Sequence, residues 1–168
     1  LYKKEVNRFH LDNGSITALN PLSEPQQKAY DEIIETFKEQ NITLLHGVTS
    51  SGKTEIYTHL IDNALKRGLQ ALYLVPEIAL TTQLTQRLHK NFGDRLLIYH
   101  SKFSDNERVD IWKKLLHSNE PCVVIVVRSS VFLPFGKLGI VIVDEEHETS
   151  YKSDSMPKYH AREVAVHL

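Results

Sequence analysis

The sequence of 168 residues has one cysteine, no long apolar run and almost no net charge. The single cysteine, Cys122, excludes a disulfide scaffold and a cysteine-ligated zinc site in this stretch of chain, and its apolar neighbours indicate a core position. No apolar run approaches the roughly 20 residues that cross a bilayer, and residues 1–5 lack a signal-peptide pattern. We therefore expect a cytoplasmic protein with no membrane partner.

The formal net charge of -1 excludes a globally basic surface. Contacts with a nucleic acid would then come from local clusters of basic residues, because bulk attraction to phosphates is absent. The chain begins without a methionine and ends at Leu168 inside a stretch with helical character. We expect from this that it is a piece of a longer protein, with partners outside it.

Two segments of different character divide the chain near residue 20. Residues 1–20 combine charged side chains with an Asn13-Gly14 turn signal and few apolar positions. They are predicted to be a linker or the remnant of a preceding DNA-binding domain. Residues 21–168 carry strong periodic patterns and are predicted to form one domain that is incomplete at its C-terminus.

Apolar periodicity and helix-start signals predict alternating helices and strands after residue 20. Helices are expected from Ser23 to about Glu39, from Lys53 to just before Gly68, across Leu80 to Leu88, and from Ser104 to Leu116. Strands are expected at Ile42 to His46, Ala71 to Val75, Arg95 to Tyr99, Cys122 to Val127 and Gly139 to Val143. The strands lack polar alternation, which is typical of a parallel sheet covered by helices on both faces. The predicted class is α/β, with ligands at the carboxyl ends of the strands.

A phosphate-binding loop follows the first expected strand. It consists of Gly47, Val48, Thr49, Ser50, Ser51, Gly52, Lys53 and Thr54, which match the P-loop pattern between a strand and a helix. The glycines let backbone N–H groups turn toward a phosphate, and the helix that follows adds its positive dipole end. Lys53 is expected to contact the β- and γ-phosphates of ATP, and Thr54 to bind Mg²⁺. The alternative is a glycine-rich connector without a ligand.

An acidic pair follows the last expected strand. Asp144 and Glu145 come directly after the apolar residues 140–143, which places them at the same sheet edge as the loop. We expect Asp144 to hold Mg²⁺, directly or through water, and Glu145 to orient or deprotonate the attacking water. The alternative for this run is a solvated acidic turn. His147 has no His or Cys partner at zinc-binding spacing, which argues against a zinc site here.

Four spaced blocks resemble the PriA helicases of superfamily 2, which carry a DEAH-type motif. The blocks are Gly47 to Glu55, Leu74 to Thr81, His100-Ser101 with Ser104 to Arg108, and Val143 to His147, and residues 128–132 and 150–162 match as well. The resemblance runs from about Pro21 to the last residue. It implies the first RecA-like lobe, with three α/β/α layers, of a two-lobe enzyme that uses ATP to unwind DNA 3′ to 5′ in replication restart.

The resemblance also implies cofactors and partners. The cofactors are ATP and Mg²⁺, with zinc expected elsewhere in the full-length protein and not in this fragment. The partners are single-stranded and forked DNA, other primosome proteins and the second RecA-like lobe of the same chain.

The same resemblance assigns residues to DNA binding. They are Pro76, Glu77, His100, Ser101, Arg128 and Ser129 along the path of the single strand, and Tyr151, Lys152, Tyr159 and Arg162 in an aromatic and basic loop. Amides, hydroxyls and guanidinium groups on such a path hold phosphates, while aromatic rings stack on bases. Glu146 and His147 are expected to couple hydrolysis to DNA. For the aromatic segment, a flexible basic surface loop around Pro157 remains the alternative.

Gln26 has two interpretations. It can close a capping box with Ser23, or it can recognise adenine as a glutamine does in many helicases of this superfamily. Departures from the usual family pattern occur at Ser50, at Val126-Val127 and at Lys158. Of these, Val127 lacks a threonine hydroxyl that could hold a DNA phosphate.

Switch GTPases, small-molecule kinases and modules that only dock partners are the competing classes. The Asn-Lys-x-Asp motif that reads guanine in GTPases is absent, and a kinase would not need Glu145 followed by a basic aromatic loop. The docking module remains a description of the fragment alone. In related NTPases an arginine finger contributes roughly 10³ to 10⁵ in rate. Because that residue normally comes from the second lobe, the isolated chain is expected to be nearly inactive.

Overall fold

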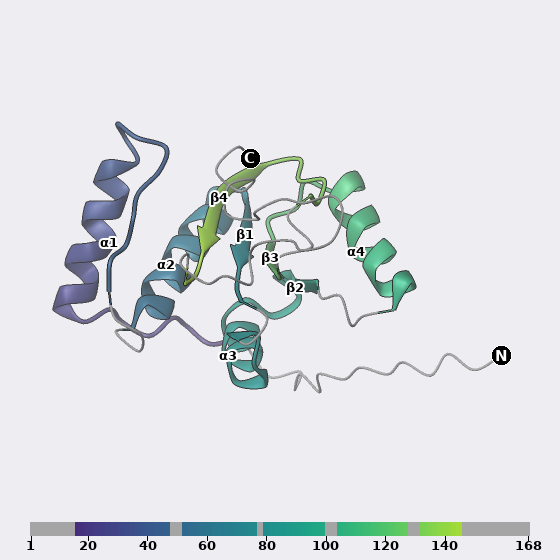
Figure 1. Ribbon diagram of the computed structural model, residues 1–168, viewed down its shortest axis with the longest axis horizontal. Coiled ribbons are helices and arrows are strands. Elements are labelled where there is room, and N and C mark those ends of the chain that lie inside the picture. Colours follow the sequence, from purple (N-terminus) through teal and green to yellow (C-terminus); the bar gives the residue numbers. More distant parts are fainter. Residues whose placement is uncertain (1–15, 48–51, 77–78, 100–103, 128–131, 146–168) are drawn as a thin grey trace.

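The central layer of the protein is a sheet in which neighbouring strands run parallel (Figure 1). The computed structural model describes residues 16–47, 52–76, 79–99, 104–127 and 132–145. Within them the strands are β1 (Gln70–Leu74), β2 (Leu96–Tyr99), β3 (Val123–Val126) and β4 (Leu138–Val143), in the spatial order β2-β3-β1-β4. Because the spatial order differs from the chain order, crossover connections link the strands, as parallel pairing requires.

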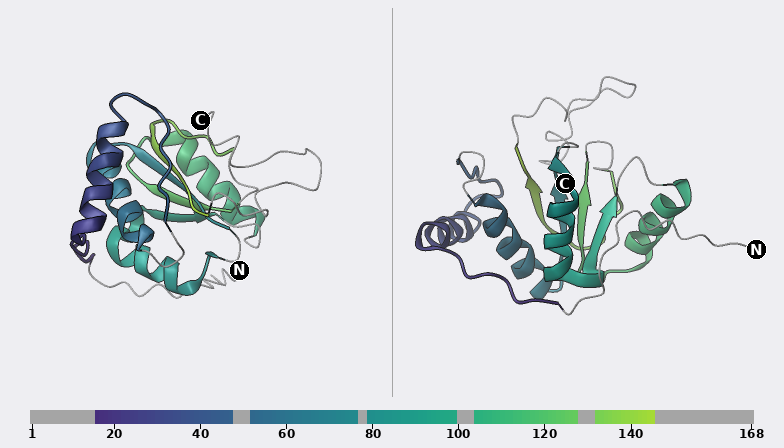
Figure 2. Two further views of the ribbon diagram at one scale, coloured as in Figure 1. Left: turned by 60° about the vertical axis from the view of Figure 1, so that its left-hand side comes forward. Right: turned by 90° about the horizontal axis from the view of Figure 1, so that it is seen from below.

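Helices cover both faces of this sheet. They are α1 (Glu24–Thr36), α2 (Lys53–Lys66), α3 (Thr82–Phe92) and α4 (Asp105–His117), with the short 3₁₀ helix η2 (Gly93–Arg95) after α3. Figure 1 shows α1 and α2 on one side of the sheet and α4 on the other, and Figure 2 shows the same layers from two further directions. No described helix has both the length and the apolar character needed to cross a membrane.

Alternate residues of each strand point into two separate cores. In β1, Ala71 and Tyr73 belong to the core that α1, α2 and α3 complete, whereas Leu72 and Leu74 belong to the core that α4 completes. All four side chains are fully buried. Burial on both faces explains why the strands lack polar residues, and it confirms the predicted three-layer α/β class.

The predicted capping boxes are present at two helix starts. At α4, the Glu107 carboxylate accepts the Ser104 N–H at 2.8 Å, and the Ser104 hydroxyl accepts the Glu107 N–H at 3.4 Å. At α1, the Gln26 side-chain oxygen accepts the Ser23 N–H at 2.9 Å. These bonds satisfy N–H groups that a helix start leaves without a backbone partner.

The strand predicted at Ile42 to His46 is wrong for the described structure. Residues 42–47 have no strand assignment, and among the described residues β4 pairs with β1 alone. The side chains of Ile42 and Leu44 are 57% and 70% exposed, while Leu45 packs against the core. A short apolar run favours extended backbone, but a strand also needs a neighbouring backbone to pair with, and the local pattern does not specify that neighbour.

The described end of the predicted linker packs on the domain. The Thr17 N–H donates to the carbonyl of Lys90 near the end of α3 at 2.8 Å, and a ring nitrogen of His59 lies 2.8 Å from the Asn20 carbonyl. The domain boundary at residue 20 stays a prediction.

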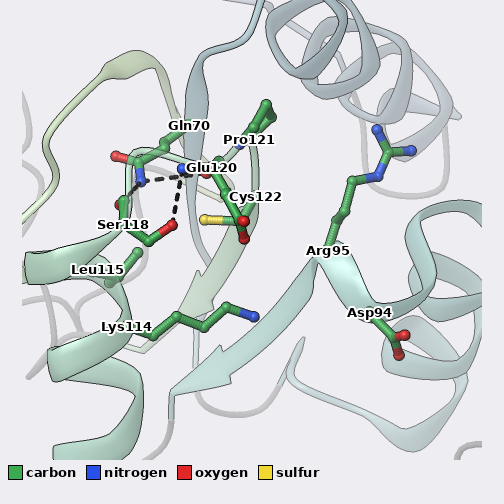
Figure 3. A pocket seen from close by; sticks show the side chains of 9 residues that line it. All are labelled: Gln70, Asp94, Arg95, Lys114, Leu115, Ser118, Glu120, Pro121 and Cys122. Atoms are coloured by element: carbon green, nitrogen blue, oxygen red, sulfur yellow. Dashed lines mark hydrogen bonds between the residues drawn. The ribbon is translucent and has the colours of Figure 1, made fainter.

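Gln70, the first residue of β1, is fully buried and uses both ends of its side-chain amide. Its Nε2 donates to the carbonyls of Ser118 (3.3 Å) and Glu120 (3.5 Å), and its Oε1 accepts from the N–H groups of Gly136 and Lys137, both at 3.0 Å. Figure 3 shows the side chain reaching toward Ser118 and Glu120. The amide therefore joins the turn before β3 to the turn before β4 at the amino edge of the sheet.

A pocket of about 50 Å³ lies at this amino edge (Figure 3). Its volume is far below the roughly 300–1,000 Å³ of small-molecule sites, so it offers no room for a nucleotide. Cys122 lines the pocket but is itself buried, and burial raises the pKa of its thiol. The predicted core position of Cys122 is confirmed.

Replacing Gln70 by Leu is expected to lower the free energy of unfolding by about 1–3 kcal/mol, because it leaves partly buried backbone groups of two turns without their partner. Urea denaturation of the Gln70→Leu chain measures this loss. Gln83→Leu, at an exposed position of α3, is the matched control and is expected to change stability by less than about 0.5 kcal/mol. Equal stability of the two variants would show that the Gln70 amide contributes nothing.

Candidate active site

The first turn of α2 lies at the carboxyl edge of the sheet. The helix ends beside the amino end of β1, since only residues 67–69 separate the two elements. Its 14 residues span about 21 Å, so the Lys53 end lies at the opposite end of β1. The ring of Tyr57 in α2 packs edge-on against the ring of Tyr73 in β1, with 5.8 Å between centroids, which holds this end of the helix over the strand.

Gly52 immediately precedes α2, in a conformation that favours glycine and in close contact with the end of the Gln26 side chain. Its φ is +78°, in the left-handed region that other residues adopt at a cost. A Cβ at this position would lie 2.3 Å from Nε2 of Gln26. That Nε2 donates to the Gly52 carbonyl at 3.1 Å, so α1 contacts the end of the P-loop directly.

Lys53 links the last part of the P-loop to its first residue, Gly47. Its ammonium donates to the carbonyl of Gly47 at 2.9 Å, which joins the two ends of the P-loop across residues 48–51. Lys53 and Thr54 are both partly buried in the first turn of α2, at the positive end of the helix dipole. Val48, Thr49, Ser50 and Ser51, which were also predicted to bind ATP, lie outside the described residues.

The β1–β4 ladder carries Asp144 to the same edge. Leu74 pairs with Val143, and the Asp144 N–H donates to the Leu74 carbonyl at 3.0 Å, which continues the ladder by one bond. Ile140 and Ile142 pack in the α2-side core, and Asp144 follows with the same parity, so its side chain is directed to the α2 face. The Tyr73 hydroxyl meets it there and donates to Oδ2 at 3.0 Å.

Glu145 leaves the strand in a strained turn. Its φ is +46°, and among the described residues it is the one non-glycine position with a positive φ. The Glu145 N–H donates to Oδ1 of Asp144 at 3.0 Å, which stabilises the turn. A left-handed residue other than glycine costs of order 1–3 kcal/mol, and such strain concentrates at functional sites.

Tyr57 of α2 lies within the electrostatic influence of the acidic pair. Burial raises the pKa of the Tyr57 phenol, and the negative charges of Asp144 and Glu145 raise it further. Tyr57 stands one turn after Lys53 and Thr54 in α2, which packs against both β1 and β4. The start of α2 and the acidic pair therefore share one small region of the carboxyl edge.

The donor set at this edge fits Mg²⁺ bound together with a nucleotide. Thr54 offers a hydroxyl oxygen and Asp144 a carboxylate, and magnesium sites of this kind use one or two protein oxygens plus substrate phosphates. Within the residues that the structure covers, no group of three or more His, Cys, Asp or Glu side chains could hold a metal by itself. Thr54 and Asp144 match a shared site, where phosphates complete the coordination.

The segments predicted to bind DNA begin at the ends of neighbouring strands. Residues 76–77 follow β1, residues 100–101 follow β2 directly, and residues 128–129 follow β3. Pro76 is buried within the described part. The other predicted DNA-binding and coupling residues lie outside the described ranges: Glu77, His100, Ser101, Arg128, Ser129, Glu146, His147, Tyr151, Lys152, Tyr159 and Arg162.

Two contacts of the site had not been predicted from the sequence. Glu55, next to Thr54, forms an ion pair with Arg87 that ties α2 to α3. No local signal announces this pair, because the partners are far apart in the chain. The bond between Tyr73 and Asp144 had a weak signal, namely a phenol in an otherwise aliphatic buried strand, which needs a hydrogen-bond partner.

The model of the DEAD/DEAH box helicase family matches residues 23–165. Replication restart protein PriA of Bacillus subtilis (strain 168) is 47% identical over 148 residues, which is 87% of this chain and 18% of that protein. PriA of Treponema pallidum is 44% identical over 146 residues, covering 87% and 22%, and PriA of Helicobacter pylori (strain J99) is 47% identical over 150 residues, covering 89% and 23%. The chain thus spans about a fifth of these curated relatives.

Solved structures support the fold. The chain superposes on the Type ISP restriction-modification enzyme LlaBIII bound to DNA with a TM-score of 0.64 at 19% identity, over 88% of this chain and 12% of that one. A nuclease-deletion mutant of LlaGI in complex with a DNA substrate mimic gives 0.61 at 20% identity, over 78% and 16%. At such low identity the likeness concerns the fold alone, and it agrees with the predicted RecA-like lobe.

Proposed function

The chain belongs to the DEAD/DEAH box helicase family, and on this premise we propose that it is the ATP-binding lobe of a 3′-to-5′ DNA helicase acting in replication restart. The observation that carries the proposal is the meeting of two motifs at one sheet edge. Gly52 to Thr54 at the start of α2 lie close to Asp144 and Glu145 at the tip of β4, through the Tyr57–Tyr73 contact and the Tyr73–Asp144 bond. Similarity to PriA proteins supports the role in restart.

Each residue at the edge has a task in hydrolysis. The Lys53 ammonium exchanges the Gly47 carbonyl for oxygens of the β- and γ-phosphates, where charge develops during in-line attack of water. Glu145 positions and deprotonates that water, with its backbone held by Asp144. Mg²⁺, held by Thr54 and Asp144, supplies neutralisation of phosphate charge when it is bound.

DNA binds along the same edge in this proposal. Pro76, Glu77, His100, Ser101, Arg128 and Ser129 follow three adjacent strands and line the path of a single strand. Backbone amides, hydroxyls and the guanidinium group of Arg128 on this path hold its phosphates. Glu146 and His147 come directly after Glu145 and couple the two ligands, while Tyr151, Lys152, Tyr159 and Arg162 add stacking and charge. Forked DNA, other primosome proteins and the second RecA-like lobe are the proposed partners, and the proposed zinc lies elsewhere in the full-length protein.

Gln26 serves ATP recognition in this proposal, in addition to its capping role. Its Oε1 accepts from Ser23 and its Nε2 reaches the carbonyl of Gly52, so the amide spans the helix start and the P-loop. An adenine base beside this loop would find a donor and an acceptor on one side chain, which matches the paired donor and acceptor of its edge.

Stimulation of ATP hydrolysis by single-stranded DNA tests the proposal, in a protein that joins this lobe to the second one. We expect DNA to increase the hydrolysis rate, and Lys53→Ala to abolish productive nucleotide binding and with it the rate at any DNA concentration. Lys38→Ala, at an exposed position after α1, is the control for loss of a lysine. A rate that DNA leaves unchanged would leave a docking module or another nucleotide hydrolase as the better description.

Glu145→Gln is expected to retain ATP binding while the hydrolysis rate falls by about 10²- to 10⁴-fold, because the amide cannot accept the proton of the attacking water. Binding of a fluorescent ATP analogue and single-turnover hydrolysis measure the two quantities separately. Glu39→Gln, on the exposed turn after α1, is expected to hydrolyse ATP normally. Hydrolysis that survives in Glu145→Gln would remove the catalytic assignment.

Gln26→Glu separates the two roles of Gln26. The carboxylate can still accept the Ser23 N–H, but it can donate neither to the Gly52 carbonyl nor to adenine. Loss of the Gly52 bond lowers stability and affects ATP and GTP binding alike, whereas loss of the donor for adenine changes the ratio of the two affinities. The ratio of ATP to GTP affinity is expected to fall about tenfold, the equivalent of one hydrogen bond. Gln83→Glu, on an exposed face of α3, controls for the added charge. An unchanged ratio would mean that Gln26 only caps the helix.

A further inference from the structure

The phenol of Tyr73 lies between Tyr57 of α2 and the Asp144 carboxylate after β4. Its side chain is fully buried in β1, and its ring packs edge-on against Tyr57 of the P-loop helix, with an angle of 65° between the ring planes. Ala71 and Val75, its neighbours on the same face of the strand, are apolar and equally buried. Within this stretch of β1, Tyr73 alone therefore carries a polar group toward the carboxyl edge.

The Tyr73 hydroxyl crosses from β1 to β4. Tyr73 pairs with Ile142 in the ladder, and the hydroxyl donates to Oδ2 of Asp144, two residues further along, at 3.0 Å. The other oxygen, Oδ1, accepts the Glu145 N–H at 3.0 Å. The two oxygens of the Asp144 carboxylate thus accept hydrogen bonds from two places, the Tyr73 hydroxyl of β1 and the backbone N–H of Glu145 in the turn after β4.

We propose that Tyr73 is a positioning residue that sets the orientation of the Asp144 carboxylate for the Mg²⁺ of the bound nucleotide, an inference that rests on the function proposed above. Rotation of a carboxylate about its last single bond is soft, so its direction depends on hydrogen bonds. Each carboxylate oxygen has two acceptor sites, so an oxygen that accepts a hydrogen bond can still bind the metal or a metal-bound water. Loss of a partner that orients a metal ligand typically costs 10- to 100-fold in metal affinity or activity.

If the Tyr73 hydroxyl only stabilised the fold, its removal would have a different effect from the one that the positioning role predicts. A buried phenol needs a partner, and Asp144 would then serve only to satisfy it. In that case removal of the hydroxyl would alter stability, or would alter nucleotide binding equally with and without metal. The positioning role instead affects only the part of binding that depends on Mg²⁺.

The experiment uses the protein that joins this lobe to the second one and compares the wild type with Tyr73→Phe, which keeps the ring against Tyr57 and removes the hydroxyl. Binding of a fluorescent ATP analogue is titrated at a series of MgCl₂ concentrations and also in EDTA. We expect the Mg²⁺ concentration for half-maximal binding to rise about tenfold in Tyr73→Phe, with unchanged affinity in EDTA. The matched control is Tyr99→Phe, whose hydroxyl contacts Arg108 and not the site, and it is expected to leave the Mg²⁺ dependence unchanged.

The outcomes separate this inference from the function on which it rests. An unchanged Mg²⁺ midpoint in Tyr73→Phe, with wild-type binding that depends on Mg²⁺ and on Lys53, overturns the positioning role and leaves the proposed function intact. An equal loss of affinity with Mg²⁺ and in EDTA also overturns it, in favour of a structural role. A two-lobe wild-type protein that binds no ATP in a Lys53-dependent way overturns both.

Discussion

The parallel ladder between β1 and β4 is the constraint on which the rest of the site depends. Its last bond, from the Asp144 N–H to the Leu74 carbonyl, sets where the acidic pair leaves the sheet. The face parity of β4 then directs Asp144 to the side that α2 covers. Since α2 runs back along β1, its first turn lies at the same end of the sheet. A shift of one residue in this register would send the carboxylate to the α4 face, away from Lys53.

The two edges of the sheet contribute differently to the protein. At the amino edge, Gln70 joins two turns with fully used hydrogen bonds, and the small pocket around Cys122 has no space for a nucleotide. At the carboxyl edge, a strained Glu145, a glycine in the left-handed region and a lysine bonded to its own loop lie together. The strained residues thus lie at the carboxyl edge, where open α/β sheets bind their ligands, and the Gln70 hydrogen bonds stabilise the opposite edge.

The elements that could be predicted were those with a local cause. Apolar, β-branched runs such as residues 123–126 predict buried strands. The Ser104–Glu107 capping box predicts the start of α4, because both partners lie within one turn. The strand expected at residues 42–46 failed for the opposite reason. Its apolar residues favour an extended backbone, but pairing requires a second chain segment, and in the described structure Ile42 and Leu44 are exposed instead.

By itself, the sequence determined the chemical groups of the two motifs: a P-loop before α2, and Asp144 with Glu145 after the strand β4. The chemistry of these groups and their common edge follow from motif and alternation, since parallel strands present their carboxyl ends together. Only the tertiary structure decided the contacts between distant segments: Gln26 with Gly52, Glu55 with Arg87, and Tyr73 with Asp144. The reason is physical, because a hydrogen bond between residues tens of positions apart depends on strand order and helix packing. The local pattern can at most indicate that a buried group such as the Tyr73 phenol needs a partner, and it does not specify which residue that partner is.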